Sequence, residues 1–233
     1  VLLVDKPRDW TSHDVVACIR GRFKIKKVGH CGTLDPAATG LLVVVLGRAT
    51  KLSQQLMGAS KVYCGVIGLG VETDSQDAAG NVVATAPVGD DVTEERVRAV
   101  ATEFVGEQLQ TPPMTSAIKK DGKKLYELAR KGKTVEREPR EITIFSLDIL
   151  RVAPPDVEFR VHCSKGTYVR TLAADFGEKL GCGGHLKSLR RERSGNFDVS
   201  DAYPMGVIKE WEREQALEAM IPLPEVLSRM TES

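Results

Sequence analysis

A glycine-rich loop that runs directly into an unbroken apolar stretch decides the fold: Gly29-His-Cys-Gly-Thr-Leu-Asp-Pro-Ala-Ala-Thr-Gly40, then Leu41-Leu-Val-Val-Val-Leu46. An uninterrupted apolar run rich in β-branched residues predicts a strand that is buried on both faces. The glycines permit tight turns and close approach of a ligand to the backbone. Asp35 precedes Pro36, so its carboxylate is held on a stiff loop where a sheet begins. Such a carboxylate can act as a nucleophile or a base, although an Asp-Pro pair also commonly starts an ordinary turn.

Other chemistries that use such loops lack their signatures here. The loop has no Gly-x-x-x-x-Gly-Lys-Ser/Thr pattern for phosphate binding, and the chain has no Gly-x-Ser-x-Gly nucleophile elbow. His30 beside Cys31 suggests a pair of metal ligands, but no second pair at ligand spacing accompanies it. Cys182 and His185 form another isolated pair. We therefore expect no metal site.

Outward from this loop, the hydrophobic pattern predicts strands and helices in no regular βαβ repeat and no all-β series. The chain opens with a strand at 1–4, and Thr11-Ser12 can cap a helix that runs to about Arg22. Further strands are predicted at 41–46, 61–69, 142–152 and 157–163, and further helices at 50–57, 93–106, 125–130, 168–180, 185–191, 209–220 and 224–230. This order favours an α+β domain with a mixed sheet.

The composition is that of an ordinary globular chain, with 233 residues of which 42% are hydrophobic and 28% are charged. No apolar run has the length needed to cross a bilayer and no signal peptide is visible, so no membrane partner is expected. The five cysteines show no paired spacing. That spacing indicates a reducing compartment, and the cytoplasm is the default.

The net charge of +1 hides a segregation of charge along the chain. Residues 1–60 carry nine Lys/Arg against four Asp/Glu, and residues 111–200 carry eighteen against twelve, whereas 61–110 and 201–233 are acidic. Such segregation can place a basic face opposite an acidic one, and a polyanion responds to the face rather than to the total. Solvated charge on helix surfaces explains the same distribution equally well.

Several ordered motifs resemble those of one enzyme family. The loop itself is similar to the signature motif of the TruB pseudouridine synthases. Companion motifs follow in the family's order: Asp5-Lys-Pro7 with Thr11-Ser12, Gly47 through Lys51, Lys61-x-Tyr63, Pro112-Pro113, Ser116 through Tyr126, Cys163 through Leu172, and Leu189-Arg-Arg191. The resemblance covers about residues 2–225.

This resemblance implies a pseudouridine synthase fold, an α+β domain whose mixed, mostly antiparallel sheet is flanked by helices. It implies a single catalytic domain over residues 1–233, in which about 105–140 form a basic insertion that grips RNA. The implied reaction converts uridine at position 55, in the T loop of tRNA, to pseudouridine. Because the base is detached, rotated and rejoined through C5 without redox change, no cofactor or metal is expected.

The resemblance also assigns the catalytic residues. Asp35 is the nucleophile, which attacks either the ribose or the base. Arg170 is the cation that keeps this carboxylate ionised, since an adjacent opposite charge lowers a carboxyl pKa. Tyr63 contacts the target base and is a candidate for moving a proton. Residue type alone gives Tyr63 a packing role on a strand instead.

The remaining assignments concern binding. Tyr168 and Leu189 are expected to line the uracil pocket, although a leucine alone more often belongs to a core. His30 is expected to pack against the RNA loop once the uridine has left its stack. Contacts to RNA phosphates are expected from a group of lysines and arginines. These are Lys6, Lys119, Lys120, Lys123, Lys124, Arg130 and Lys131.

The implied partner is tRNA, bound through its T arm by a monomer that needs no other protein. The chain departs from the family pattern at Arg8-Asp9-Trp10, where a glycine is usual, at Cys31, and at Thr115, where a tyrosine is usual. Since the chain stops soon after Pro224, we expect the small C-terminal RNA-binding domain of the PUA type to be absent. Two alternatives stay open: a guide-RNA-dependent enzyme acting on ribosomal RNA, and an RNA-folding chaperone whose chemistry is incidental.

Overall fold

The apolar run after the glycine-rich loop forms strand β3 (Thr39–Leu46) in the computed structural model, and the strand is buried on both faces as predicted. Leu41, Val43 and Val45 belong to one hydrophobic cluster, whereas the alternate residues Leu42, Val44 and Leu46 belong to another. Because side chains alternate across a strand, β3 separates two cores. This double burial explains why its sequence shows no polar alternation.

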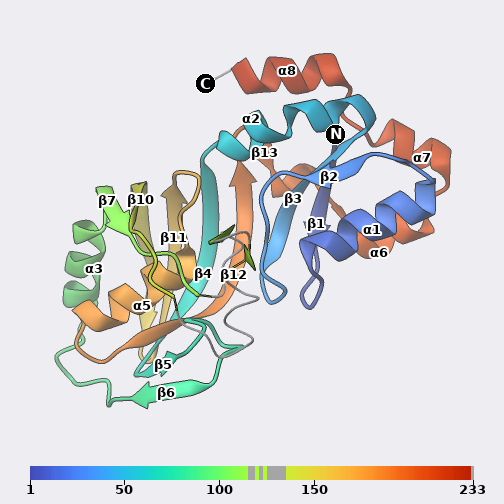
Figure 1. The fold of residues 1–233 in the computed structure, drawn as a ribbon. Helices are drawn as coiled ribbons and strands as arrows, with labels where there is room; N and C mark the ends of the chain where they lie inside the picture. The colour runs from blue at the N-terminus through green and yellow to red at the C-terminus, as the bar shows by residue number, and fades with distance from the viewer. Residues whose placement is uncertain (115–118, 121–122, 125–134, 232–233) are drawn as a thin grey trace. The chain divides into compact units, whose positions relative to one another are not determined.

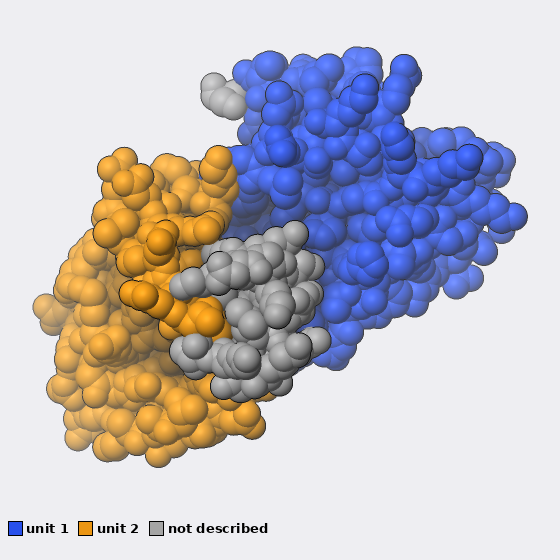
Figure 2. Space-filling view, in the orientation of Figure 1, with its two compact units in different colours: residues 1–64, 189–233 blue, residues 65–188 orange. Residues whose placement is uncertain are grey.

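The structure describes residues 1–114, 119–120, 123–124 and 135–231, which divide into two units (Figures 1 and 2). Unit 1 comprises residues 1–64 and 189–233, and unit 2 comprises residues 65–188. Strands β4 (Lys61–Leu69) and β12 (Gly184–Ser194) each have residues in both ranges. None of the described helices is both long and apolar enough to span a membrane.

Unit 1 contains the loop. Its other elements are β1 (Leu2–Lys6), α1 (Ser12–Phe23), β2 (Val28–His30), the 3₁₀ helix η1 (Gly47–Leu52), α2 (Ser53–Gly58), β13 (Phe197–Asp198), η2 (Val199–Asp201), β14 (Tyr203–Pro204), α6 (Met205–Glu210), α7 (Arg213–Glu218) and α8 (Leu223–Thr231). The strand order is β14-β1-β3-β12, with β2 also paired to β3 and β13 to β12. Strand β1 runs antiparallel to β3, whereas β12 runs parallel to it.

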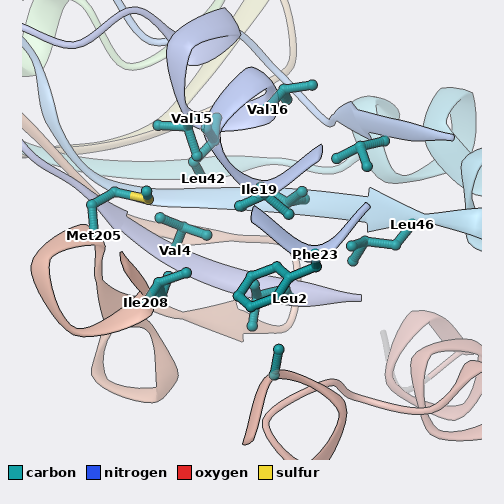
Figure 3. Packing of buried hydrophobic residues seen from close by; sticks show 13 residues of the cluster. Leu2, Val4, Val15, Val16, Ile19, Phe23, Leu42, Leu46, Met205 and Ile208 are labelled. Carbon is teal, nitrogen blue, oxygen red and sulfur yellow. The ribbon is translucent and has the colours of Figure 1, made fainter. Parts of the chain in front are cut away.

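Helix α1 covers one face of β1 and β3 (Figure 3). Thr11 caps the helix, because its hydroxyl accepts from the backbone N–H of Asp14 while the Asp14 carboxylate accepts from the backbone N–H of Thr11. Val15 and Ile19 then point at the strands, and Met205 and Ile208 of α6 complete the cluster. The predicted helix from Thr11-Ser12 is confirmed.

The described part of unit 2 contains strands of the main sheet, two two-stranded sheets and two helices. Its elements are β5 (Val71–Thr73), β6 (Val82–Thr85), α3 (Glu94–Glu103), β7 (Gly106–Gln110), β8 (Lys119–Lys120), β9 (Lys123–Lys124), β10 (Arg140–Ala153), β11 (Asp156–Cys163) and α5 (Val169–Lys179). The main strands lie in the order β4-β11-β10-β7, and β10 is antiparallel to both neighbours. Phe104 after α3 stacks on Phe176 of α5 with ring centroids 5.7 Å apart. The α+β class with a mostly antiparallel sheet and flanking helices is confirmed.

Two predicted helices were wrong. The segment 185–191 lies in strand β12, because its pairing with neighbouring strands outweighs the helix propensity of its Leu, Lys and Arg residues. The predicted helix 209–220 is two helices, α6 and α7, since Trp211 has an extended backbone (ψ 142°) and Glu212 starts a new capping box. The predicted helix 125–130 lies outside the described residues.

Candidate active site

The Asp35 loop is the tight connection between the antiparallel strands β2 and β3. Strand β2 pairs with β3 up to His30, and the Cys31 N–H still donates to the Val43 carbonyl at 2.9 Å. The chain then leaves the sheet and turns at Asp35, whose carbonyl accepts from the Ala38 N–H at 3.0 Å. Pro36 occupies the second position of this turn, where its fixed φ is favourable. The half-buried Asp35 side chain therefore stands on a closed, rigid turn.

Ser12, at the start of α1, fixes the middle of the loop. Its hydroxyl accepts from the Leu34 N–H at 2.9 Å and donates to the Leu34 carbonyl at 3.2 Å. Ser12 is 2% exposed and Leu34 is 3% exposed, so water does not compete for either bond. This reciprocal pair satisfies both backbone groups of the residue that precedes Asp35.

Lys6 supports the loop from within the protein, which corrects its predicted contact with RNA phosphates. The side chain is fully buried and its Nζ donates to the carbonyls of Pro7 at 2.9 Å, Trp10 at 2.6 Å and Pro36 at 3.2 Å. An ammonium group has only three protons, so all of them are used. The Asp9 N–H adds a second bond to the Pro36 carbonyl at 2.8 Å, from a left-handed backbone (φ 65°) that ordinarily favours glycine.

Arg191 of β12 lies against the same loop. Its Nε donates to the Leu41 carbonyl at 2.6 Å and its Nη2 donates to the Gly32 carbonyl at 3.1 Å. The backbone of Arg191 pairs with Gly40, which has a φ of 98° and no room for a Cβ because the Arg191 nitrogen would lie 2.8 Å away. Gly32 (φ 100°) is also in a conformation that favours glycine.

The charges along the sequence that contains the loop are mostly basic. Between Val15 and Val71 the only acidic residue is Asp35, whereas this segment holds eight Lys/Arg. Burial lowers the pKa of Lys6 to about 8, and the negative charge of Asp35 is the largest influence that raises it. Burial raises the pKa of the Cys31 thiol to about 11, which keeps the thiol protonated and unreactive at neutral pH. The carboxylate of Asp35 is thus the reactive group that this loop offers.

His30 is held neutral beside the loop. Burial, and then the charge of Arg191, lower its pKa below the ordinary value. Its Nδ1 is buried and has no hydrogen-bond partner among the described residues. A buried ring nitrogen without a hydrogen bond costs folding free energy, and such a group often belongs to a functional site. Within the described ranges, no three His, Cys, Asp or Glu side chains gather as metal ligands would.

Unit 2 carries the second group of predicted residues, at the start of α5. Arg170 is 6% exposed, and its Nη1 lies 3.3 Å from the Ser75 carbonyl and 3.6 Å from Asp77 Oδ2. Gln110 holds Tyr168, since the Tyr168 N–H donates to Gln110 Oε1 at 2.8 Å and Gln110 Nε2 donates to the Tyr168 carbonyl at 3.1 Å. Arg170 is therefore buried beside an acidic partner within its own unit.

The predicted site residues thus fall into two groups. Asp35, His30, Tyr63 and Leu189 belong to unit 1, and Tyr63 and Leu189 are both half-buried on strands. Tyr168 and Arg170 belong to unit 2. The pairing of Arg170 with Asp35 stays a prediction. Four of the predicted RNA-binding lysines form a small antiparallel hairpin, in which the backbone of Lys119 pairs with that of Lys124 and the backbone of Lys120 with that of Lys123. Arg130 and Lys131 lie outside the described residues.

Sequence reasoning missed the residues that hold the site in place. Ser12, Gln110 and Arg191 were noticed at most as parts of motifs, although each is buried and bonded to the backbone of a site segment. The sequence predicted a helix around Arg191, so no local pattern indicated that this arginine is buried on a strand. Gln110 stands beside Gln108 and Thr111 in a mostly polar segment, so no local pattern marks it.

Two family models together match most of the chain. Residues 20–169 match the TruB family pseudouridylate synthase (N terminal domain), and residues 170–228 match the tRNA pseudouridylate synthase B C-terminal domain. The boundary between the two models lies at the start of α5, between Tyr168 and Arg170. The matched regions include both groups of site residues, whereas Lys6 and Ser12 precede them.

Curated relatives are similar over nearly the whole chain. A tRNA pseudouridine synthase B of Opitutus terrae is 51% identical over 99% of this chain and 91% of its own length. A protein of the same name from Syntrophotalea carbinolica is 52% identical over 97% of this chain and 74% of its own length. That of Aromatoleum aromaticum is 48% identical over 99% of this chain.

Solved structures with the same fold belong to larger chains. A chain in the crystal structure of a Cbf5-Nop10-Gar1 complex superposes with a TM-score of 0.77 and 31% identity, over 98% of this chain and 61% of that chain. A chain in an H/ACA RNP bound to a substrate RNA containing 2'-deoxyuridine gives a TM-score of 0.69 and 28% identity, over 57% of that chain. The chain thus spans about three fifths of these structural neighbours.

Proposed function

This chain belongs to the TruB family of pseudouridylate synthases, and we propose that it isomerises uridine 55 in the T loop of tRNA with Asp35 as the nucleophile. Isomerisation of uridine to pseudouridine in tRNA follows from the family membership. The T-loop position and the identity of the nucleophile are the parts that our proposal adds.

One observation carries the assignment of the nucleophile. Asp35 is the only acid between Val15 and Val71, and it stands on a turn whose backbone is fixed by Ser12, Lys6 and Arg191. A positioned nucleophile gains most of its advantage from being held in the attacking geometry before the substrate arrives. The surrounding cations favour the ionised form of the carboxylate, which is the form that can attack.

The reaction then needs only bond exchange within one nucleotide. Attack by an Asp35 carboxylate oxygen accompanies cleavage of the bond between C1′ of the ribose and N1 of uracil. The base rotates, C5 bonds to C1′ and the bond that Asp35 formed to the nucleotide breaks, so the carboxylate is restored. The C5 proton is lost and N1 gains a proton. Atoms and electrons balance without an oxidant or a metal. We assign Tyr63 to the contact with the base, and Arg170 to pairing with the Asp35 carboxylate.

Binding of the folded T arm requires that the uridine leave its stack, which costs a few kcal/mol, about 2–4, before any chemistry. We propose that the lysine hairpin β8–β9 contacts phosphates and that His30, Tyr168 and Leu189 receive the displaced nucleotides. The neutral state of His30 supports this role, because an uncharged ring stacks on a base without losing a hydration shell.

We propose that the chain acts as a stand-alone monomer in the cytoplasm, and that both units form one catalytic domain. All five cysteines are free thiols, which supports a reducing compartment. The observation that favours a second candidate is the likeness to a chain crystallised with Nop10 and Gar1. On that alternative the chain would act on ribosomal RNA only with a guide RNA and partner proteins.

Tritium release from tRNA transcribed with 5-tritiated uridine tests the proposal. The purified chain alone should release about one tritium per tRNA, and a transcript with cytidine at position 55 should release none. Equal release from both transcripts would refute the position. Release that appears only after a guide RNA and partner proteins are added would establish the alternative function.

A further inference from the structure

We propose that Arg191 is a positioning residue for the reaction, which sets the geometry of the Asp35 loop by joining its two ends. The inference rests on the proposed function, because it concerns the loop that carries the nucleophile. Nothing in the sequence motifs assigns such a role to this residue, which was predicted to lie in a helix.

The guanidinium bridges the points where the loop leaves and re-enters the sheet. Gly32 is the first loop residue after the bond of Cys31 to β3, and Leu41 is the first residue of the buried apolar run. Arg191 donates to the carbonyls of both, through Nη2 and Nε respectively. The planar guanidinium presents its donors in a fixed fork, so the two carbonyls are held at a set separation.

The backbone of Arg191 completes the clamp from the same position. It pairs with Gly40 in the parallel register of β12 and β3, so close that no Cβ fits at Gly40. A Cβ at Gly32 would lie 3.4 Å from Nη1 of Arg191. The two glycines of the loop that have a positive φ and flank Asp35 are thus both packed against this single residue.

Burying the charged side chain of Arg191 costs free energy unless strong interactions inside the protein compensate for the lost water. The residue is 1% exposed, and its guanidinium donates to two backbone carbonyls rather than to a carboxylate. A buried cation without an ion pair is normally disfavoured by desolvation. A methionine, which is neutral and of similar length, could pack there at lower cost, but it has no hydrogen to donate to either carbonyl.

The two neighbouring arginines on β12 differ from Arg191, because the side chain of each is partly exposed and lies beside a carboxylate. Arg190 bonds to both oxygens of the Asp5 carboxylate at 2.9 and 2.7 Å, and its side chain is 42% exposed. The Arg193 side chain is 51% exposed and lies 4.0 Å from Asp198. Of these three, Arg191 alone is aimed at backbone carbonyls of the catalytic loop.

The test compares Arg191→Lys with the matched control Arg193→Lys in the full chain. Lysine keeps the charge, but its single nitrogen cannot reproduce the fork. Single-turnover conversion of tRNA by Arg191→Lys should slow by about 10- to 100-fold, with Kd for tRNA changed less than about twofold. The control should match the wild type in both. A full-rate Arg191→Lys, or a loss confined to Kd, would overturn the proposal.

A measurement on the wild type keeps the inference testable even if Arg191→Lys fails to fold. In ¹⁵N-arginine spectra, the Arg191 Nε–H should exchange slowly with solvent and its Nη groups should give separate signals, because both bonds hinder rotation. One averaged, rapidly exchanging Nη signal would overturn the clamp. This readout needs no activity, so a wild type that converts no tRNA would refute the proposed function without deciding the clamp.

Discussion

Replacing Ser12 by alanine removes the hydroxyl that holds Leu34 in the middle of the Asp35 loop. The change leaves the Leu34 N–H and carbonyl without their bonds of 2.9 and 3.2 Å, in a region where both residues are at most 3% exposed. An unsatisfied buried donor costs about 1–3 kcal/mol, and the longer bond adds about 0.5–1 kcal/mol. Alanine at the start of α1 recovers up to about 0.5 kcal/mol of helix propensity. The expected net loss is about 2 kcal/mol.

Thermal and urea unfolding measure this loss directly. For a chain of this size, about 2 kcal/mol corresponds to a fall of roughly 4–8 °C in Tm. The matched control is Ser200→Ala, because the exposed Ser200 hydroxyl makes one bond, to Asp198, and should change stability by less than about 0.5 kcal/mol. Turnover of tRNA by Ser12→Ala should also fall. Equal stability of the two variants would refute the reasoning that the loop depends on this pair of bonds.

Three further predictions follow from the same contacts. Gly40→Ala should abolish soluble folded protein or its activity, because the new Cβ would overlap the Arg191 backbone; a fully active variant seen by circular dichroism and turnover would contradict this. The stability of the wild type relative to Lys6→Met should rise between pH 8 and pH 10.5, because burial lowers the pKa of Lys6 and the unfolded chain therefore binds more protons in that window. If the urea midpoints of the two proteins differ by the same amount throughout this window, Lys6 is not a buried ammonium. Neutralising the β8–β9 lysines together should weaken tRNA binding and flatten the plot of log Kd against log salt by up to about 3 units of slope, and an unchanged slope would remove the hairpin from the RNA interface. Those lysines are Lys119, Lys120, Lys123 and Lys124.

The fold was predictable where one local pattern dominated. The apolar run of β3, the capped helix α1 and the alternating strands β10 and β11 all follow from periodicity and capping. Strand β12 was missed because its charged residues have helix propensity, and its pairing with neighbouring strands makes it a strand. The short strands β2 and β7 were missed as well, since three to five residues carry little periodicity.

The candidate nucleophile had a sequence signal, whereas the residues that hold its loop had none. Asp35 stands in a distinctive loop, whereas the role of Ser12 depends on Leu34, which is twenty-two residues away. For Lys6, the sequence suggested a function that the structure does not support. Its place in a motif predicted RNA binding, but the side chain is buried and its protons are bonded to backbone carbonyls. Contacts between distant backbone segments have no local signature, so the supporting residues could not be assigned from sequence.

The central claim is that the Asp35 carboxylate does the chemistry. Tritium release from 5-tritiated tRNA should be measured for the wild type and for Asp35→Asn, alongside tRNA binding by both. Asparagine keeps the shape of the side chain but has no nucleophilic carboxylate, so binding should persist while release falls to background. Release by Asp35→Asn at the wild-type rate would contradict the account, and binding without release by the wild type would favour an RNA-folding role instead.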